Sequence, residues 1–120
     1  MYKIIFYEDN NGESEIKNYM KQLQKMNSKD ARLKFNKMAG YINMLSTYGL
    51  SMGKKHIKHL VDDIWELRPL RDRILFAYWN NNSFILLSIF MKKTRKTPKR
   101  EIEKAKRNLE SFIKRGEKDG

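Results

Sequence analysis

The side chains best suited to chemistry in this sequence are basic, and they lie in two short segments. Arg68, Arg71 and Arg73 fall within six residues, and Lys92 and Lys93 follow an apolar run further along the chain. Guanidinium and ammonium groups that are held in place stabilise negative charge, including the charge that develops on phosphate oxygens. The residue types therefore indicate a site for a phosphate group or another anion.

The two basic segments are expected to meet at one end of a β-hairpin. Residues 73–79 and 83–91 are rich in β-branched and aromatic residues, and three asparagines separate them. Residues at equal distances from the turn of an antiparallel hairpin face each other. Arg73 and the pair Lys92–Lys93 then lie at the same end of the sheet and form a cationic cluster.

Residue types alone leave two other interpretations open. The arginines can instead pair with the neighbouring acids Glu66 and Asp72 as surface ion pairs, which contribute little to stability. His56 and His59 lie among lysines, which favour the neutral imidazole. A neutral imidazole can act as a general base, although most such histidines are ordinary surface residues.

Composition argues against several other kinds of site. The chain has no cysteine, so it has neither a disulfide framework nor a cysteine zinc site, and it has two histidines. It shows no glycine-rich phosphate loop and no nucleophile–histidine pattern. We therefore expect no metal and no cofactor.

Charge is the most pronounced feature of the composition. The formal net charge is +12, and residues 92–115 carry eleven lysines or arginines against three acids, whereas residues 1–30 are neutral overall. A concentrated basic segment is typical of a surface that binds a polyanion such as nucleic acid. The start of the chain lacks the apolar segment of a signal peptide, and no apolar run is long enough to span a membrane. We expect a cytoplasmic protein without membrane contact.

Hydrophobic periodicity predicts an α+β fold in the order β-α-α-β-β-β-β-α. A small antiparallel sheet is expected to pack against an N-terminal helical hairpin and a C-terminal helix, in one domain of residues 1–116 followed by a charged tail, 117–120. The predicted strands are 2–8, 57–61, 64–67, 73–79 and 83–91. The predicted helices follow caps at Ser14 or Asn11, at Ser28 and at Thr97; the second ends at Gly49 and the last near Arg115.

Four motifs within residues 64–107 carry a family resemblance. They read WELR at 65–68, RI at 73–74, KKTRKTP at 92–98 and EIEKAK at 101–106. This pattern resembles the RelE/ParE superfamily, and within it the HigB-like, phage-derived, DUF-type branch of type II toxin–antitoxin systems. The resemblance implies a RelE-like fold that agrees with the one predicted from periodicity.

The resemblance also implies an activity and partners. The expected activity is that of an endoribonuclease, an mRNA interferase that inhibits translation by cutting mRNA in the ribosomal A site. Cleavage without a metal uses the 2′-OH as nucleophile and yields a cyclic phosphate. The implied protein partner is a HigA-like antitoxin with a helix-turn-helix domain, and operator DNA is contacted only through that antitoxin.

Residue roles follow from the same resemblance. Arg68, Arg73 and Lys93 are expected to be catalytic. RNA-binding roles are expected for Arg71, Lys92, Arg95, Lys96 and His59. The RelE branch also uses a tyrosine in its last helix, and that position here is Ile102, so the general acid or base stays open between the lysine pair and a histidine.

Two rival functions remain on the sequence alone. One is a ParE-like gyrase inhibitor, which shares the fold but needs no catalytic cluster and leaves RNA intact. The other is a non-catalytic RNA-binding module, which binds RNA without cutting it.

Overall fold

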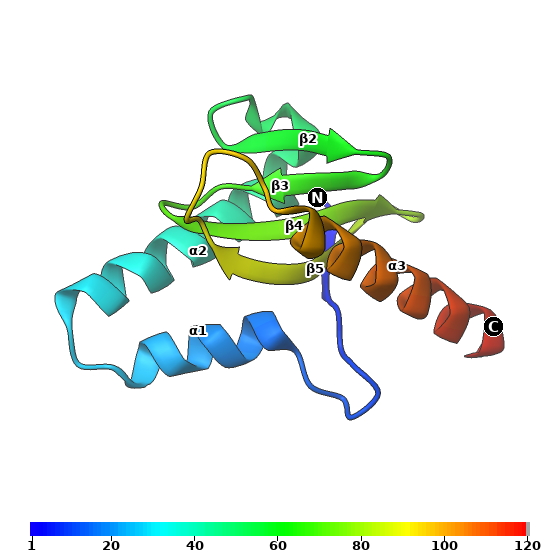
Figure 1. Cartoon of the computed structure of the whole chain (residues 1–120), viewed down its shortest axis with the longest axis horizontal. Helices are drawn as coiled ribbons and strands as arrows, with labels where there is room; N and C mark the ends of the chain where they lie inside the picture. The colour runs from blue at the N-terminus through cyan, green and yellow to red at the C-terminus, as the bar shows by residue number, and fades with distance from the viewer. Residues whose placement is uncertain (120) are drawn as a thin grey trace.

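The structure is a computed structural model that describes the backbone of residues 1–119 and the side chains of residues 1–116. The order of elements along the chain is the predicted one (Figure 1). The elements are β1 (Lys3–Phe6), α1 (Glu15–Lys25), α2 (Lys29–Tyr48), a short 3₁₀ turn η1 (Gly49–Met52), β2 (Ile57–Val61), β3 (Ile64–Leu67), β4 (Asp72–Trp79), β5 (Ser83–Met91) and α3 (Lys99–Asp119).

The five strands form one sheet in the order β1-β5-β4-β3-β2. Strands β2 to β5 form an antiparallel meander, as predicted. Strand β1 differs, because it pairs with β5 in parallel, with Lys3 opposite Ser83 and Phe6 opposite Leu86. The sheet is therefore mixed, within the predicted α+β class. Parallel and antiparallel edge strands have the same two-residue period, so the sequence pattern does not distinguish them.

Helices cover both faces of the sheet (Figure 1). Alternate residues along a central strand therefore point to different helices. Ile74 and Phe76 face the core shared with α1 and α2. Leu75 and Ala77 face a second cluster that includes Ala105 of α3. Strand β5 is buried on both sides from Ser83 to Ser88, as its continuous apolar run predicted.

The ends of the first two helices are formed by the residues that the sequence indicated. The hydroxyl oxygens of Ser14 and Ser28 accept hydrogen bonds from the backbone N–H groups of Lys17 and Ala31. Gly49 follows α2 with φ of 60°, and a Cβ there would lie 2.7 Å from the Tyr2 ring. Glycine is required at this position on both counts.

The third helix differs from its prediction at both ends. It begins at Lys99, and the hydroxyl of Thr97, the predicted cap, instead donates to the side chain of Glu66. It continues past Gly116 to Asp119. The side chains of the predicted charged tail, 117–120, lie outside the described residues. Within the described part of the chain, no helix is both long and apolar enough to cross a membrane.

Candidate functional site

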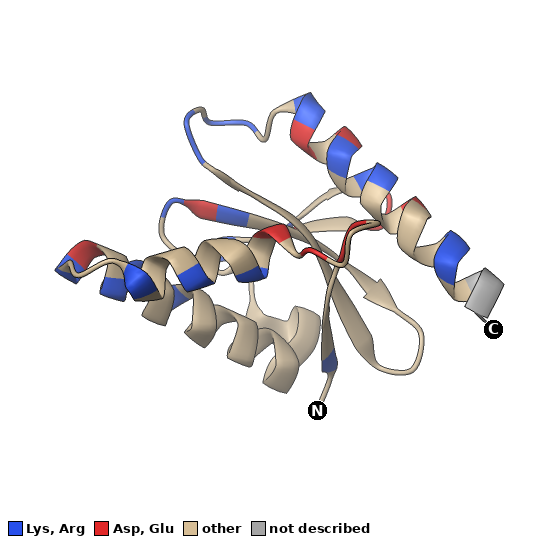
Figure 2. Ribbon diagram, turned by 90° about the horizontal axis from the view of Figure 1, so that it is seen from below, with Lys and Arg blue, Asp and Glu red and all other residues tan. Residues whose placement is uncertain are grey.

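A shallow hollow lies at the end of the sheet where β5 leads into the loop before α3. Its lining contains basic residues from β2, from the connection between β3 and β4, from β4 and from this loop, and Figure 2 shows the lysines and arginines of the loop in blue. The basic lining residues are Lys58, Arg68, Arg73, Lys92, Lys93, Arg95 and Lys96. The cationic cluster predicted from the hairpin geometry is therefore present, and it also includes a lysine from β2.

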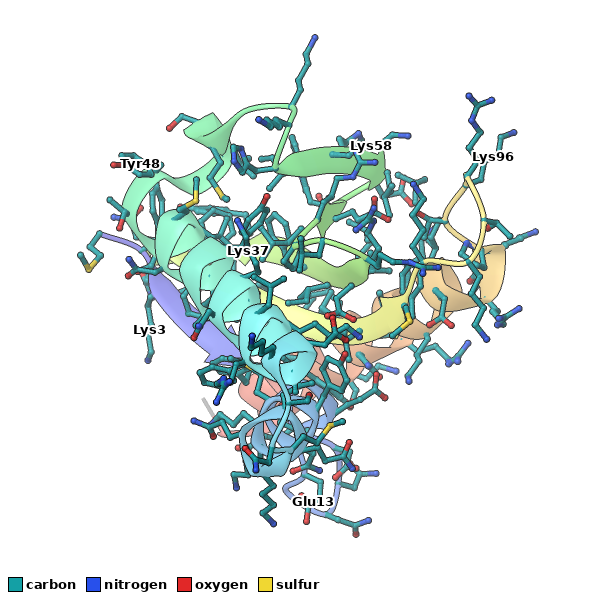
Figure 3. The ribbon with its side chains drawn as sticks, turned by 90° about the vertical axis from the view of Figure 1, so that its left-hand side faces the viewer. Lys3, Glu13, Lys37, Tyr48, Lys58 and Lys96 are labelled. Carbon is teal, nitrogen blue, oxygen red and sulfur yellow. The ribbon has the colours of Figure 1, made fainter. Side chains whose placement is uncertain are left out.

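The strand register explains why these side chains meet. Lys58 of β2 is opposite Glu66 of β3, and Glu66 is opposite Leu75 of β4, two residues after Arg73. Side chains two residues apart on a strand lie on the same face. Lys58, Glu66 and Arg73 therefore share the face that α3 covers, and Figure 3 shows Lys58 and Lys96 on the same side of the molecule.

Arg73 is the most firmly held of the cations. Its side chain is 8% exposed, and Nη1 donates to the backbone carbonyls of Leu70 at 2.7 Å and Asp72 at 2.9 Å. Burial lowers the pKa of Arg73, and the Glu66 carboxylate opposes that shift. An arginine nevertheless stays charged, because its ordinary pKa lies above about 12. The result is a preorganised positive charge at the floor of the hollow.

The turn before β4 helps to hold this arginine. Leu70 has φ of 55°, a left-handed conformation that costs a residue with a side chain roughly 1 kcal/mol. In that turn the carbonyl of Leu70 accepts the hydrogen bond from Arg73, and the N–H of Asp72 donates to the carbonyl of Pro69. The strain is thus located where the backbone positions a charged side chain.

Glu66 is the residue at this site whose importance the sequence did not reveal. Its side chain is 5% exposed, and Oε1 lies 3.6 Å from Nε of Arg68 and 3.8 Å from Nε of Arg73. Its other oxygen, Oε2, accepts the Thr97 hydroxyl at 2.5 Å. Of the two alternative ion pairings, the one with Glu66 occurs, within the site and not as a pair of exposed side chains, whereas Asp72 forms no ion pair with an arginine among the described residues. One sequence signal was present: Glu66 occupies an inward-facing strand position, two residues after the buried Ile64.

The remaining predicted residues divide between the hollow and its surroundings. Lys93, Arg95 and Lys96 are exposed on the loop, and Lys92 is half-buried. Arg71 is outside the lining, but it is bound to the same loop: its Nη2 donates to the carbonyl of Lys92 at 3.3 Å, and the Lys92 N–H donates to its carbonyl at 2.8 Å.

The histidines are not part of the hollow. The ring of His59 packs against Trp65 at 5.0 Å, and its Nε2 lies 2.7 Å from the carbonyl oxygen of Asp62. That contact requires a proton on Nε2, so this nitrogen has no free lone pair for a base. His56 packs against Tyr41 on the α2 side. Ile102 of α3 is likewise not among the residues that line the hollow.

The hollow has the electrostatics of an anion site. Seven basic side chains surround a single carboxylate among the described lining residues. Its volume is about 20 Å³, close to that of one water molecule by this measure, so a phosphate would bind at its mouth. In the described part of the chain, no three histidine, aspartate or glutamate side chains are close enough together to hold a metal ion.

Comparison with known proteins agrees with this picture at the level of the family. No curated protein sequence matches the chain. The family described as "Phage derived protein Gp49-like (DUF891)" matches residues 21–110, which include β2 to β5, the basic loop and the first half of α3. The match covers three quarters of the sequence and every basic residue of the hollow. The chain therefore belongs to the Gp49-like phage-derived proteins, a toxin-like family of toxin–antitoxin systems.

Proposed function

We propose that this protein is the toxin of a type II toxin–antitoxin pair and acts as a ribosome-dependent mRNA endoribonuclease. The observation that carries the proposal is the buried, doubly anchored Arg73 at the floor of a hollow with seven basic residues. Membership of a toxin-like family supports it independently. A toxin that acts only by binding another protein, such as a gyrase inhibitor, would not need a buried cation at the centre of a basic hollow.

The proposed reaction needs no metal. The ribose 2′-oxygen attacks the adjacent phosphorus, the bond to the 5′-oxygen breaks, and a 2′,3′-cyclic phosphate and a 5′-hydroxyl are formed. Negative charge increases on the phosphate oxygens in the transition state, and the proposed role of Arg73 and Arg68, which line the hollow, is to stabilise that charge. Lys92 and Lys93 are the proposed proton carriers, because an ammonium group can give up its proton and a guanidinium group cannot.

The shallowness of the hollow favours dependence on the ribosome. A hollow of about 20 Å³ does not enclose a nucleotide. The proposal is therefore that this protein contributes charge and that the ribosome holds the RNA in position. In the ribosomal A site the mRNA is already held in place. We expect free mRNA to be cut far more slowly than mRNA on ribosomes.

A HigA-like helix-turn-helix antitoxin is the partner that completes the proposal. The toxin-like family implies an antitoxin in general. A net charge of +12 favours rapid association with an acidic partner through electrostatic steering. Operator DNA is reached through the antitoxin.

Primer extension on a defined mRNA, with and without ribosomes, tests the proposal. We expect new 5′ ends within codons when ribosomes and wild-type protein are both present, and about a hundredfold slower formation of these ends with Arg73→Ala. RNA binding without cleavage would favour the non-catalytic RNA-binding module. Intact mRNA together with inhibition of DNA supercoiling would favour the gyrase inhibitor.

A further inference from the structure

A second and larger cavity lies on the other side of the sheet end, between α1 and the end of β5. This cleft has a volume of about 510 Å³. Among the described residues that line it are four acids and no lysine or arginine. The acids are Asp9, Glu13, Glu15 and Asp72. On a protein with a net charge of +12, this lining is locally acidic, although Lys104 of α3 pairs with the Glu15 carboxylate at 2.6 Å.

The innermost acid of the cleft has an unmet hydrogen-bonding capacity. Asp72 is 2% exposed, and its Oδ1 accepts the hydroxyl of Tyr19 at 3.1 Å. Its Oδ2 is buried and has no hydrogen-bond partner among the described residues. The nearest lysine of this network, Lys34, donates to the Tyr19 oxygen at 3.3 Å. A buried carboxylate oxygen without a partner is costly, so its retention in a lined cavity points to a donor that arrives from outside.

We propose that this acidic cleft binds a basic side chain, most favourably an arginine, of the antitoxin protein. The proposal rests on the proposed function, which supplies that partner. A guanidinium carries five N–H donors, so one of them can meet the unpartnered Oδ2 of Asp72 while others meet the exposed carboxylate of Glu13. Ile89, Phe90 and Met91 form the apolar wall of the cleft, against which the carbon stem of an arginine can pack.

The chemistry of the cleft favours a polypeptide over other occupants. Its carboxylates repel the phosphates of RNA, and among the described residues no three of them are close enough to hold a metal ion. One wall is the end of β5, beyond the part that β1 pairs with, and there the Ile89 N–H bonds to the side chain of Glu15. Phe90 lines both this cleft and the basic hollow. A partner anchored here would therefore lie next to the hollow and could cover it.

The test is a peptide titration of the folded, full-length protein followed by NMR. The probe is the peptide acetyl-Ala-Arg-Ala-amide, and its uncharged match contains citrulline in place of arginine. We expect the arginine peptide to bind with a Kd of about 1–10 mM and to shift the signals of the Asn18 and Gln22 side-chain amides and the Ile89 N–H. The citrulline peptide is expected to bind at least about tenfold more weakly, because it has lost its charge.

Three variants locate the binding. Asp72→Asn keeps the shape of the side chain and is expected to weaken the arginine peptide about tenfold. Glu13→Gln changes an exposed acid at the rim and is expected to weaken it severalfold, even if Asp72→Asn folds poorly. Glu110→Gln is the matched control, because Glu110 is an exposed acid on α3 outside this cleft, and the Kd should not change.

Several outcomes would overturn the proposal. They are shifts centred on Lys92–Lys96, equal binding of both peptides, an unchanged Kd in both cleft variants, and binding of free putrescine as tight as that of the peptide. The titration does not measure RNA cleavage. Failure of cleavage with peptide binding intact would therefore refute the proposed function alone, and intact cleavage without peptide binding would refute the cleft.

Discussion

Two neighbouring residues of β4, Asp72 and Arg73, lie in two contrasting regions of the molecule. Both are buried, and because they alternate along a strand they point to opposite faces of the sheet. Arg73 enters the basic hollow with two carbonyls and Glu66 as partners. Asp72 enters the acidic cleft with one oxygen bonded and the other free. Figure 3 shows Lys96, at the outer edge of the hollow, and Glu13, at the rim of the cleft, in different parts of the molecule, although Phe90 lines both regions.

The two regions differ in whether the protein satisfies its own buried polar group. In the basic hollow the protein itself pairs the buried Arg73, and the remaining positive charge is available to a substrate that stays only briefly. In the acidic cleft the protein leaves an oxygen of Asp72 without a hydrogen bond, and a donor on a partner would satisfy it for as long as the partner is bound. A site of the first kind suits turnover, and a site of the second kind suits stable complex formation.

The largest expected effect comes from removing the anchored cation. Arg73→Ala should lower the rate of mRNA cleavage on ribosomes by about a hundredfold, roughly 3 kcal/mol, because one transition-state donor is lost. Arg73→Lys keeps the charge but loses the planar fork, so it should restore only part of the rate. Lys114→Ala, on the exposed side of α3, is the control and should leave the rate unchanged. Wild-type cleavage by both Arg73→Ala and Lys93→Ala, with loss in His59→Ala, would replace the cationic site with a histidine mechanism.

A smaller effect should follow from removing the negative charge at the centre of the hollow. Glu66→Gln leaves Arg73 buried without its compensating carboxylate, so the free energy of unfolding should fall by about 2 kcal/mol. Urea unfolding followed by circular dichroism measures this. Glu110→Gln, which alters an exposed ion pair with Lys114, should change stability by less than about 0.5 kcal/mol. Equal effects of the two substitutions would mean that Glu66 is an ordinary surface acid.

Removing the buried charge of Asp72 is expected to have the opposite effect, an increase in the free energy of unfolding. Burial raises the pKa of Asp72, while Lys34, the Tyr19 hydroxyl and Arg73 partly oppose the shift. The folded state therefore holds this proton more tightly, so Asp72 contributes stability at low pH that is lost as the pH rises through its folded pKa. Asp72→Asn should raise the free energy of unfolding at pH 7, and the gain should vanish below pH about 4.

Thermal unfolding of the wild type and of Asp72→Asn across pH 3 to 8 measures this dependence. Asp63→Asn is the matched control, because Asp63 is exposed, and it should show no such trend. A loss of stability at pH 7 in Asp72→Asn would show that the carboxylate is stabilised in the folded protein, and the cleft would then have no unmet acceptor.

The smallest effect is expected at the rim of the hollow. Lys96→Ala should weaken RNA binding about uniformly across sequences, because an exposed lysine contacts phosphate and not bases. The slope of log affinity against log salt concentration should become shallower by about one. Fluorescence anisotropy at several salt concentrations measures both quantities. Lys37→Ala, which removes an exposed lysine on α2 away from the hollow, should change neither. Equal effects at both positions would mean that RNA binds to the basic surface in general.

Local sequence patterns were sufficient to predict most of the fold and the meeting of basic residues in the hollow. The asparagine turn and the flanking apolar runs placed Arg73 near Lys92 and Lys93, because hairpin geometry is fixed by a short connection. Ser14, Ser28 and Gly49 act at the helix ends as their residue types indicate. The catalytic and RNA-binding roles of the basic residues stay predictions.

The features that were missed depend on contacts between distant parts of the chain. Thr97 has the residue type of a helix cap, but its hydroxyl donates a hydrogen bond to Glu66, which is far away in the sequence. The unmet oxygen of Asp72 depends on the packing of Tyr19 from α1, 53 residues earlier. Neither partner can be identified from spacing, because no local repeat connects them.

The parallel pairing of β1 with β5 has a consequence for how the chain folds during its synthesis. During synthesis Lys3–Phe6 emerge well before Ser83–Leu86, the residues with which they pair, so β1 must wait for β5 before it can join the sheet. Pairing over so long a separation slows folding, because a large loop must close first. The sheet therefore stays incomplete until β5 has emerged. The basic hollow is completed later still, because the loop after β5 supplies four of its seven basic residues.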